Sequence, residues 1–214
     1  MCGRLGISLL AADERPRSPN FKEPDMSEAE MTNEPFILRR EDVPSFWLVD
    51  SLWSVLATAD TTGGALSIMD QVMPKGSGPP AHIHPRLHEY FYLLEGDISY
   101  QLGDQVLSAS AGAFVSVPAT TVHGFVVRSE TARVLNLYTP GGFTEQISAL
   151  GTPTTDLRLP REGDQVAATN DTENAYLRHS AELNTQRWLK PDEGKDLLAA
   201  QRAAPIGSES GWHV

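Results

Sequence analysis

The sequence predicts an all-β jelly-roll barrel with short flanking helices after the barrel. The 15 prolines and 17 glycines, spread among short apolar runs, favour strands and turns over long helices. The runs recur at the spacing of short antiparallel strands, which is typical of a double-sheet barrel. His123 lies far in sequence from His82, His84 and Glu89, and these four side chains can meet only in a closed or sandwiched sheet. A length of 214 residues suits one domain with extensions.

The chain divides into three parts. Residues 1–34 are polar, charged and interrupted by prolines, so we expect a flexible N-terminal extension, and Met26 or Met31 could be the true start in place of Met1. The barrel and a short flanking helix are expected in residues 35–150. Residues 151–214 are expected to form a C-terminal tail of loop and helix.

Apolar runs before the central motif predict four strands. They are residues 35–40, 46–49, 52–57 and 65–73, with a turn at 61–64.

The central barrel follows in order. The predicted strands are 81–84, 89–94, 98–102, 105–109, 114–117, 123–128 and 132–138. Gly103-Asp104 is a dipeptide suited to a tight turn, so the third and fourth of these strands are expected to form a hairpin.

The pattern changes after Pro140. Phe143, Ile147 and Leu150 lie on one face of a short helix that is expected to cover or flank the barrel mouth. Residues 152–190 are expected to be mostly loop, and residues 192–204 a second helix. Trp188 and Trp212 are expected to anchor the tail by packing, and His179 and His213 are expected at the surface. None of these four residues is given a role in the site.

Four residues form the strongest functional signal. His82 and His84 are two apart in a strand and therefore project from the same face. Glu89 can join them from the next strand, and His123 from a later one. Three imidazoles and a carboxylate can hold a divalent metal and leave coordination positions open for chemistry. His88 adjoins Glu89 and should face the opposite way; it is the alternative ligand in place of Glu89.

These residues resemble the cupin family. The segment Gly76-x5-His82-x-His84-x4-Glu89-x6-Gly96 matches the first cupin signature at every fixed position. The second signature matches at Gly112-x5-Pro118 and His123, whereas Thr120 replaces the usual glycine and Val127 the usual asparagine. The His-x-His pattern does not repeat, which indicates one cupin domain rather than two.

Within the cupins, the chain resembles bacterial proteins grouped with quercetin 2,3-dioxygenase. The likeness covers Phe36 to Gly64 and Pro79 to about Leu159, above all the segment from Tyr138 to Pro153. It implies a metal-dependent dioxygenase that cleaves a flavonol-like enol or phenol with O2. It also implies Glu89 as general base and a homodimer. It favours nickel, cobalt or manganese as the one divalent ion, and the donor set itself would also accept iron.

Strand alternation extends the inward face from the metal ligands. If His123 faces inward, so do Thr121, Phe125 and Val127, and if Glu89 does, so do Phe91 and Leu93. These five residues are the predicted substrate pocket, which would suit a small aromatic substrate. They could equally fill the barrel core.

Charge and cysteine content exclude some classes of partner. The net charge of −11 makes nucleic acid and anionic membranes unfavourable partners. The single cysteine, Cys2, excludes an internal disulfide and fits a cytoplasmic protein. Two further functions stay open: another metal cupin enzyme (an isomerase, a decarboxylase or a biosynthetic tailoring oxygenase), and a non-enzymatic cupin that binds a small ligand.

Overall fold

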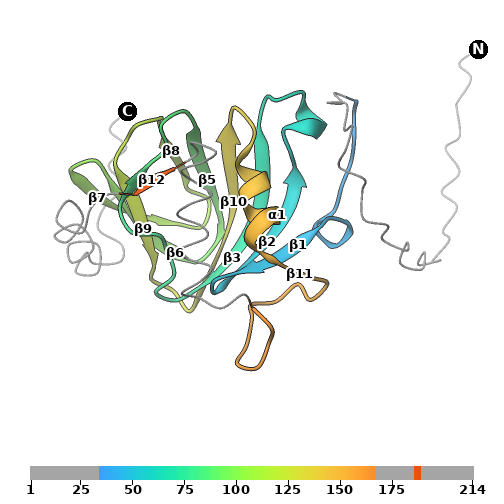
Figure 1. Cartoon of the computed structure of the whole chain (residues 1–214). Helices are drawn as coiled ribbons and strands as arrows, with labels where there is room; N and C mark the ends of the chain where they lie inside the picture. Colours follow the sequence, from blue (N-terminus) through green and yellow to red (C-terminus); the bar gives the residue numbers. More distant parts are fainter. Residues whose placement is uncertain (1–33, 167–185, 189–214) are drawn as a thin grey trace, which may run out of the picture.

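The computed structural model describes residues 34–166 and 186–188, and these form two antiparallel sheets that face each other (Figure 1). The seven-stranded sheet has the order β11-β1-β2-β3-β10-β5-β8, and the five-stranded sheet the order β12-β4-β9-β6-β7. This is the predicted all-β jelly roll. Residues 1–33 of the predicted extension, the predicted second helix, Trp212, His179 and His213 lie outside the described residues.

The strands fall close to their predicted positions. Their bounds are β1 Ser45–Leu48, β2 Ser51–Ala57, β3 Ser67–Pro74, β4 His82–Ile83, β5 His88–Glu95, β6 Asp97–Leu102, β7 Gln105–Ser110, β8 Phe114–Val117, β9 His123–Val127, β10 Thr131–Thr139, β11 Thr152–Thr154 and β12 Arg187–Trp188. Two short 3-10 helices, η1 (Arg40–Asp42) and η2 (Asp60–Thr62), and one α-helix, α1 (Phe143–Leu150), complete the described elements. The hairpin of β6 and β7 is confirmed, and Gly103 in its turn has a φ of +58°.

One predicted strand is wrong. Residues 35–39 form no regular structure and lead into η1, and the side chains of Phe36, Ile37 and Leu38 are exposed. A strand there would need a neighbour to pair with. One edge of β1 pairs with β2, and the other edge pairs with β11, where Pro153 lies opposite Phe46 of β1.

The helix predicted after Pro140 is confirmed as α1, which contacts β1 and β3 (Figure 1). Its buried residues Phe143 and Ile147 belong to one apolar cluster, with Leu48, Val55, Met69, Leu87 and Tyr138. A second cluster fills the other part of the barrel and contains Phe91, Leu93, Tyr100, Phe125 and Val127 among others. The helix therefore flanks the barrel as expected and closes one side of its interior.

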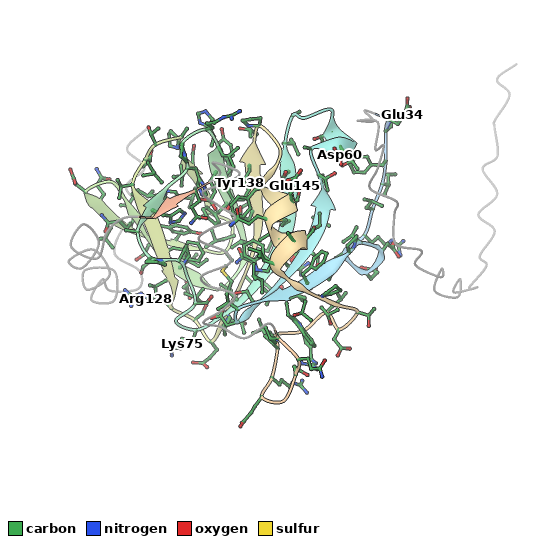
Figure 2. All side chains as sticks on the ribbon, in the orientation of Figure 1. Glu34, Asp60, Lys75, Arg128, Tyr138 and Glu145 are labelled. Carbon is green, nitrogen blue, oxygen red and sulfur yellow. The ribbon has the colours of Figure 1, made fainter. Side chains whose placement is uncertain are left out.

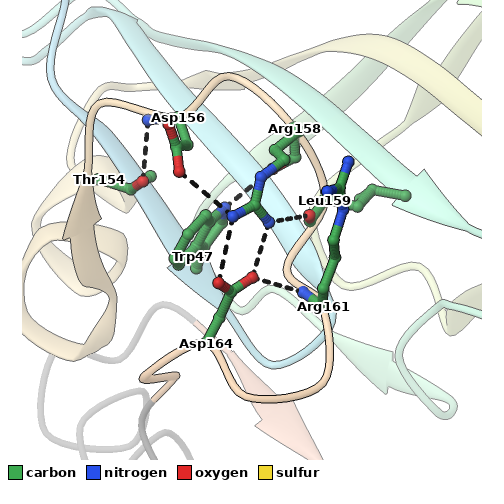
Figure 3. Close-up of polar contacts among 7 residues, drawn as sticks. All are labelled: Trp47, Thr154, Asp156, Arg158, Leu159, Arg161 and Asp164. Atoms are coloured by element: carbon green, nitrogen blue, oxygen red, sulfur yellow. Dashed lines mark hydrogen bonds and ion pairs between the residues drawn. The ribbon is translucent and has the colours of Figure 1, made fainter.

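The loop after β11 is fastened to β1 by Arg158 (Figure 3). The backbone carbonyl of Arg158 accepts a 2.8 Å hydrogen bond from Nε1 of Trp47, and the guanidinium carbon lies 5.0 Å from the centroid of the Trp47 ring. The same guanidinium binds both carboxylate oxygens of Asp164, at 2.6 and 3.1 Å. Hydrogen bonds from Arg158 and from the backbone of Arg161 lower the pKa of Asp164 to about 2. The predicted tail is thus tied to the seven-stranded sheet at its beginning.

Candidate metal centre

His82 and His123 are brought together by the pairing of β4 with β9, in which they are direct cross-strand partners. Their ring centroids are 4.1 Å apart. In each ring Nδ1 donates to a backbone carbonyl two residues earlier, Pro80 at 2.9 Å for His82 and Thr121 at 2.8 Å for His123. These bonds fix the ring orientation and the tautomer, and they leave Nε2 as the nitrogen that would ligate a metal.

His84 and Glu89 complete the cluster from the other side. Nε2 of His84 lies 3.2 Å and Nε2 of His123 lies 2.9 Å from Oε2 of Glu89. One potential ligand atom from each of the four residues lies within 4.8 Å of the others, and all four side chains are buried. Because Glu89 belongs to the seven-stranded sheet and His82 and His123 to the five-stranded sheet, the cluster lies between the two sheets. The donor set and its compactness fit a divalent metal ion.

Burial and neighbouring groups shift the pKa values of two residues in the cluster. Burial, and then the nearby His123 and His84, lower the pKa of His82 well below its usual value. Burial alone would raise the pKa of Glu89, but its close contacts with His123 and His84 outweigh burial and hold that pKa well below its usual value. At neutral pH His82 is therefore neutral and Glu89 is ionised, which are the forms that ligate metals.

Two residues that the sequence analysis did not single out hold the second oxygen of Glu89. Tyr138 on β10 donates its hydroxyl to Oε1 at 2.5 Å, and Nδ2 of Asn136 donates to the same oxygen at 3.2 Å. Tyr138 lies beside α1, where its ring stacks on Phe143 with centroids 3.9 Å apart (Figure 2). Asn136 carried a detectable signal, because it is a polar residue at an inward position between Val134 and Tyr138.

A cavity of about 360 Å³ opens onto the cluster. His82 and Glu89 lie in its wall, and its other lining residues include Asp50, Trp53, Gln71, Phe125, Asn136, Tyr138 and Phe143. Asp50 accepts hydrogen bonds from the hydroxyls of Ser51 at 2.8 Å and Ser77 at 2.9 Å. None of the lining residues in the described part of the chain is lysine or arginine.

Of the five predicted pocket residues, the structure places only Phe125 in the wall of this cavity. Phe91, Leu93 and Val127 face inward as expected but pack in the apolar cluster of the barrel core. Thr121 is half-buried, and its backbone carbonyl accepts the Nδ1–H of His123. Strand parity was therefore right for Phe91, Leu93, Phe125 and Val127. Most of the cavity lining comes from the 49–50 turn, the loop 76–80 and the strands β1, β2, β3 and β10.

His88, the alternative ligand, lies on the outer face of β5. Its side chain is exposed, and its Nδ1 is the acceptor of a 3.4 Å contact from the backbone N–H of Ala119. Glu89, with 3% exposure, is the residue of this pair that points to the histidines.

Comparison with known proteins agrees with this description. Residues 69–138 match the family described as "Cupin domain". Over 119 residues, the chain is 29% identical to a quercetin 2,3-dioxygenase of Bacillus subtilis, covering 56% of this chain and 35% of that protein. Over 208 residues, it is 28% identical to a quercetin 2,3-dioxygenase of Aspergillus japonicus, covering 83% of this chain and 59% of that protein. Among solved structures, KdgF from Halomonas sp. is 19% identical with a TM-score of 0.46, over 52% of this chain and 99% of that one.

Residues 69–138 of the barrel thus match the cupin domain family. The chain resembles quercetin 2,3-dioxygenases, and it spans about a third and three fifths of the length of the two curated relatives. As for membrane association, none of the helices in residues 34–166 and 186–188 has the length and apolar character needed to cross a bilayer.

Proposed function

We propose that this protein is a metal-dependent dioxygenase that cleaves a flavonol-like enol or phenol with O2. The observation that carries the proposal is the buried His82, His84, Glu89 and His123 cluster in contact with a cavity that has no cationic side chain among its described lining residues. The similarity to quercetin 2,3-dioxygenases supports the same reading. The substrate class, the use of O2 and the metal are all part of the proposal.

The four-residue set would hold one divalent ion, with nickel, cobalt, manganese and iron as the candidates. A bound ion supplies positive charge that makes a nearby substrate hydroxyl easier to ionise. The residues of the chain supply the rest: the three imidazoles hold their Nε2 atoms in place, and the cavity walls orient the substrate and exclude water.

Glu89 is proposed to accept the proton of the substrate hydroxyl. Its Oε1 is held by Tyr138 and Asn136, so the carboxylate has a fixed orientation toward the cavity that it lines. A fixed carboxylate within reach of a substrate hydroxyl can act as a general base. Phe125 and Phe143 give the cavity aromatic surface that suits a flat aromatic ring.

The charge of the cavity favours a substrate without a carboxylate. An anionic substrate would find Asp50 and Glu89 in the wall and no lysine or arginine among the described lining residues. The bound ion would be the one counter-ion near the described lining residues, and an anionic group that does not reach it is costly to desolvate. A phenol or enol can enter in its neutral form and lose its proton beside the ion, so we favour it over the substrates of a decarboxylase.

The test is metal analysis of the protein as purified, followed by oxygen uptake with flavonols on protein reloaded with each candidate ion. We expect close to one ion per chain and oxygen consumption with at least one flavonol. Flavone, which lacks the 3-hydroxyl, is the matched control and should consume none. If no candidate ion gives oxygen uptake with any flavonol, the dioxygenase proposal fails. An isomerase, another oxygenase or a ligand-binding cupin would then take its place.

The remaining expectations stay predictions. They are a homodimer, a cytoplasmic location and the absence of nucleic-acid and membrane partners. Light scattering of the purified protein tests the first.

A further inference from the structure

Two polar atoms without partners lie in neighbouring residues of the cavity wall. Trp53 on β2 and Gln71 on β3 are direct cross-strand partners, and both line the cavity. Nε1 of Trp53 and Oε1 of Gln71 are buried, and neither has a hydrogen-bond partner among the described residues. A buried polar atom without a partner destabilises the folded state, so two in adjacent residues call for an explanation.

The pair lies well away from the metal centre along the strands. Tyr138 on β10 pairs with Glu89 on β5 and with Ser67 on β3. Ser67 therefore lies at the same height along the strands as Glu89 of the metal cluster. Gln71 is four residues further along β3, opposite Val134. At about 3.3 Å per residue, this separation is about 13 Å along the strand. A substrate that meets Glu89 at one end of the cavity would meet Trp53 and Gln71 with its other end.

The other end of the cavity also has an unpaired atom. Oδ1 of Asn136 is buried without a partner among the described residues, although Nδ2 of the same side chain binds Glu89. The same cavity wall also includes the apolar side chains of Leu48, Phe125 and Phe143. The cavity is therefore suited to a molecule with an apolar body and polar groups at two separate places.

The chemistry of the pair selects one kind of group. The indole N–H of Trp53 can only donate a hydrogen bond, and the amide oxygen of Gln71 can only accept one. A carbonyl would satisfy only the first and an ammonium only the second, whereas a hydroxyl can accept from Trp53 and donate to Gln71 at once. We propose that Trp53 and Gln71 together bind a phenolic hydroxyl on the ring of the substrate that is remote from the metal centre. This inference rests on the proposed function, and it adds which hydroxylation pattern the site selects.

A site that hydrogen-bonds a substrate hydroxyl discriminates strongly against the analogue that lacks it, because its own polar groups are then left unpaired. The test measures binding without turnover, by calorimetry on the metal-loaded protein with oxygen excluded. The probes are 3-hydroxyflavone and its 4′-hydroxy and 7-hydroxy derivatives, which differ only in the presence and place of a remote hydroxyl.

The variants are Trp53→Phe and Gln71→Met, which remove the donor and the acceptor while keeping an apolar side chain of related shape. Each has a matched control outside the cavity lining. Trp47→Phe removes an indole N–H that already binds the carbonyl of Arg158. Gln101→Met removes a buried amide of β6 that also has an unpaired oxygen, but Gln101 does not line the cavity.

We expect the parent protein and both controls to bind one remote-hydroxyl derivative at least tenfold more tightly than 3-hydroxyflavone. In Trp53→Phe and Gln71→Met this preference should fall below about twofold, with the affinity for 3-hydroxyflavone unchanged or improved. A preference that survives in Gln71→Met, or an equal loss for all three ligands, overturns the inference. Binding and oxygen uptake without any preference for a remote hydroxyl would refute it and leave the proposed function standing. If the parent binds none of the flavonols, both proposals fail together.

Discussion

The hydroxyl of Tyr138 donates a 2.5 Å hydrogen bond to Oε1 of Glu89, the carboxylate oxygen opposite the one that contacts His84 and His123. Asn136 donates to the same oxygen, so Oε1 of Glu89 is bound by Tyr138 and Asn136, whereas Oε2 faces the histidines. Because a carboxylate held in this way cannot rotate freely, we expect Tyr138 to act as a positioning residue for Glu89. Residues that orient a metal ligand are often nearly as important as the ligand itself.

The first prediction concerns this contact. Tyr138→Phe removes one hydroxyl and keeps the ring that stacks on Phe143. We expect a loss of 10-fold to 100-fold in activity or metal affinity, about the usual scale for an outer-shell partner of a ligand. Metal content and oxygen uptake of the variant are measured together. Tyr90→Phe, on the outward-facing side of β5, is the control, and normal values for Tyr138→Phe would refute the positioning role.

The second prediction tests the ligand set. His84→Ala or His123→Ala should strip the metal and leave a folded barrel, since neither apolar cluster of the core contains a histidine. Elemental analysis measures the metal and circular dichroism the fold. His88→Ala, which changes an exposed histidine of the same barrel, should keep its metal. Full occupancy in either ligand variant would show that the ion is held elsewhere.

Much of the fold was predictable because the signals are local. Turn residues such as Gly103 and the apolar alternation of β10 mark where strands begin, end and face. The strand predicted at residues 35–40 was wrong because its formation depends on long-range pairing. Whether an apolar run becomes a strand depends on a free edge, and the edge of β1 is occupied by β11, more than 100 residues later in the chain.

The site shows the same division between local and long-range information. The spacing of His82, His84 and Glu89 gave the direction of each side chain, and the structure brings these residues and His123 together. Alternation could not tell which inward residues line a cavity and which fill the core. Phe91 packs against Tyr100 with ring centroids 5.2 Å apart, whereas Trp53 and Gln71 line the cavity from strands that carry no part of the motif.

The third prediction follows from the departure at Thr120. This residue replaces the glycine that cupins usually have, and its φ of +68° lies in the left-handed region. A β-branched residue is strained there, and its exposed side chain gains little from packing. Thr120→Gly should therefore stabilise the protein by about 0.5–1 kcal/mol, after allowing for the greater entropy of glycine in the unfolded chain.

Thermal unfolding measures this change. Thr120→Ala is the control, because it removes the branching but keeps the Cβ atom, and it should stabilise the protein less than glycine does. The backbone N–H of Thr120 donates to the carbonyl of His84 at 2.8 Å, so the metal content of the glycine variant should also be checked. A lower melting temperature for Thr120→Gly would show that the strain has been misjudged.

The fourth prediction is the pH dependence of the metal-free protein. Since the pKa of His82 is lowered by burial and by His123 and His84, the unfolded chain takes up a proton below about pH 6.5 that the folded chain does not. Stability should therefore fall as the pH drops below 6.5, by at most about 1.4 kcal/mol per pH unit from this residue. The lowered pKa of Glu89 acts in a lower window, because its contribution is complete above about 4.5 and is lost as the pH falls through its folded pKa.

Chemical denaturation between pH 5 and 7.5 in the presence of a chelator measures the slope. His82→Asn should flatten it, and His88→Asn, at an exposed position, should leave it unchanged. A parent protein whose stability is constant across this range would contradict the prediction. Saturating metal should oppose the loss, because the ion binds only the deprotonated ligands.

The last prediction assigns two roles to one side chain. Glu89 is proposed both to bind the metal and to accept the substrate's proton, whereas the histidines only bind. Glutamine keeps the size and one coordinating oxygen, and the Tyr138 hydroxyl can hydrogen-bond either end of the amide. Glu89→Gln should therefore retain much of the metal. As an amide is a far weaker base, activity should fall about 100-fold or more, the usual scale for removing a positioned general base. Glu95→Gln, at the exposed end of the same strand, is the control.

Metal content and oxygen uptake are compared in the same preparations. Near-parental turnover of a flavonol by metal-loaded Glu89→Gln would show that the proton goes elsewhere, whereas loss of the metal together with the activity would reduce Glu89 to a ligand.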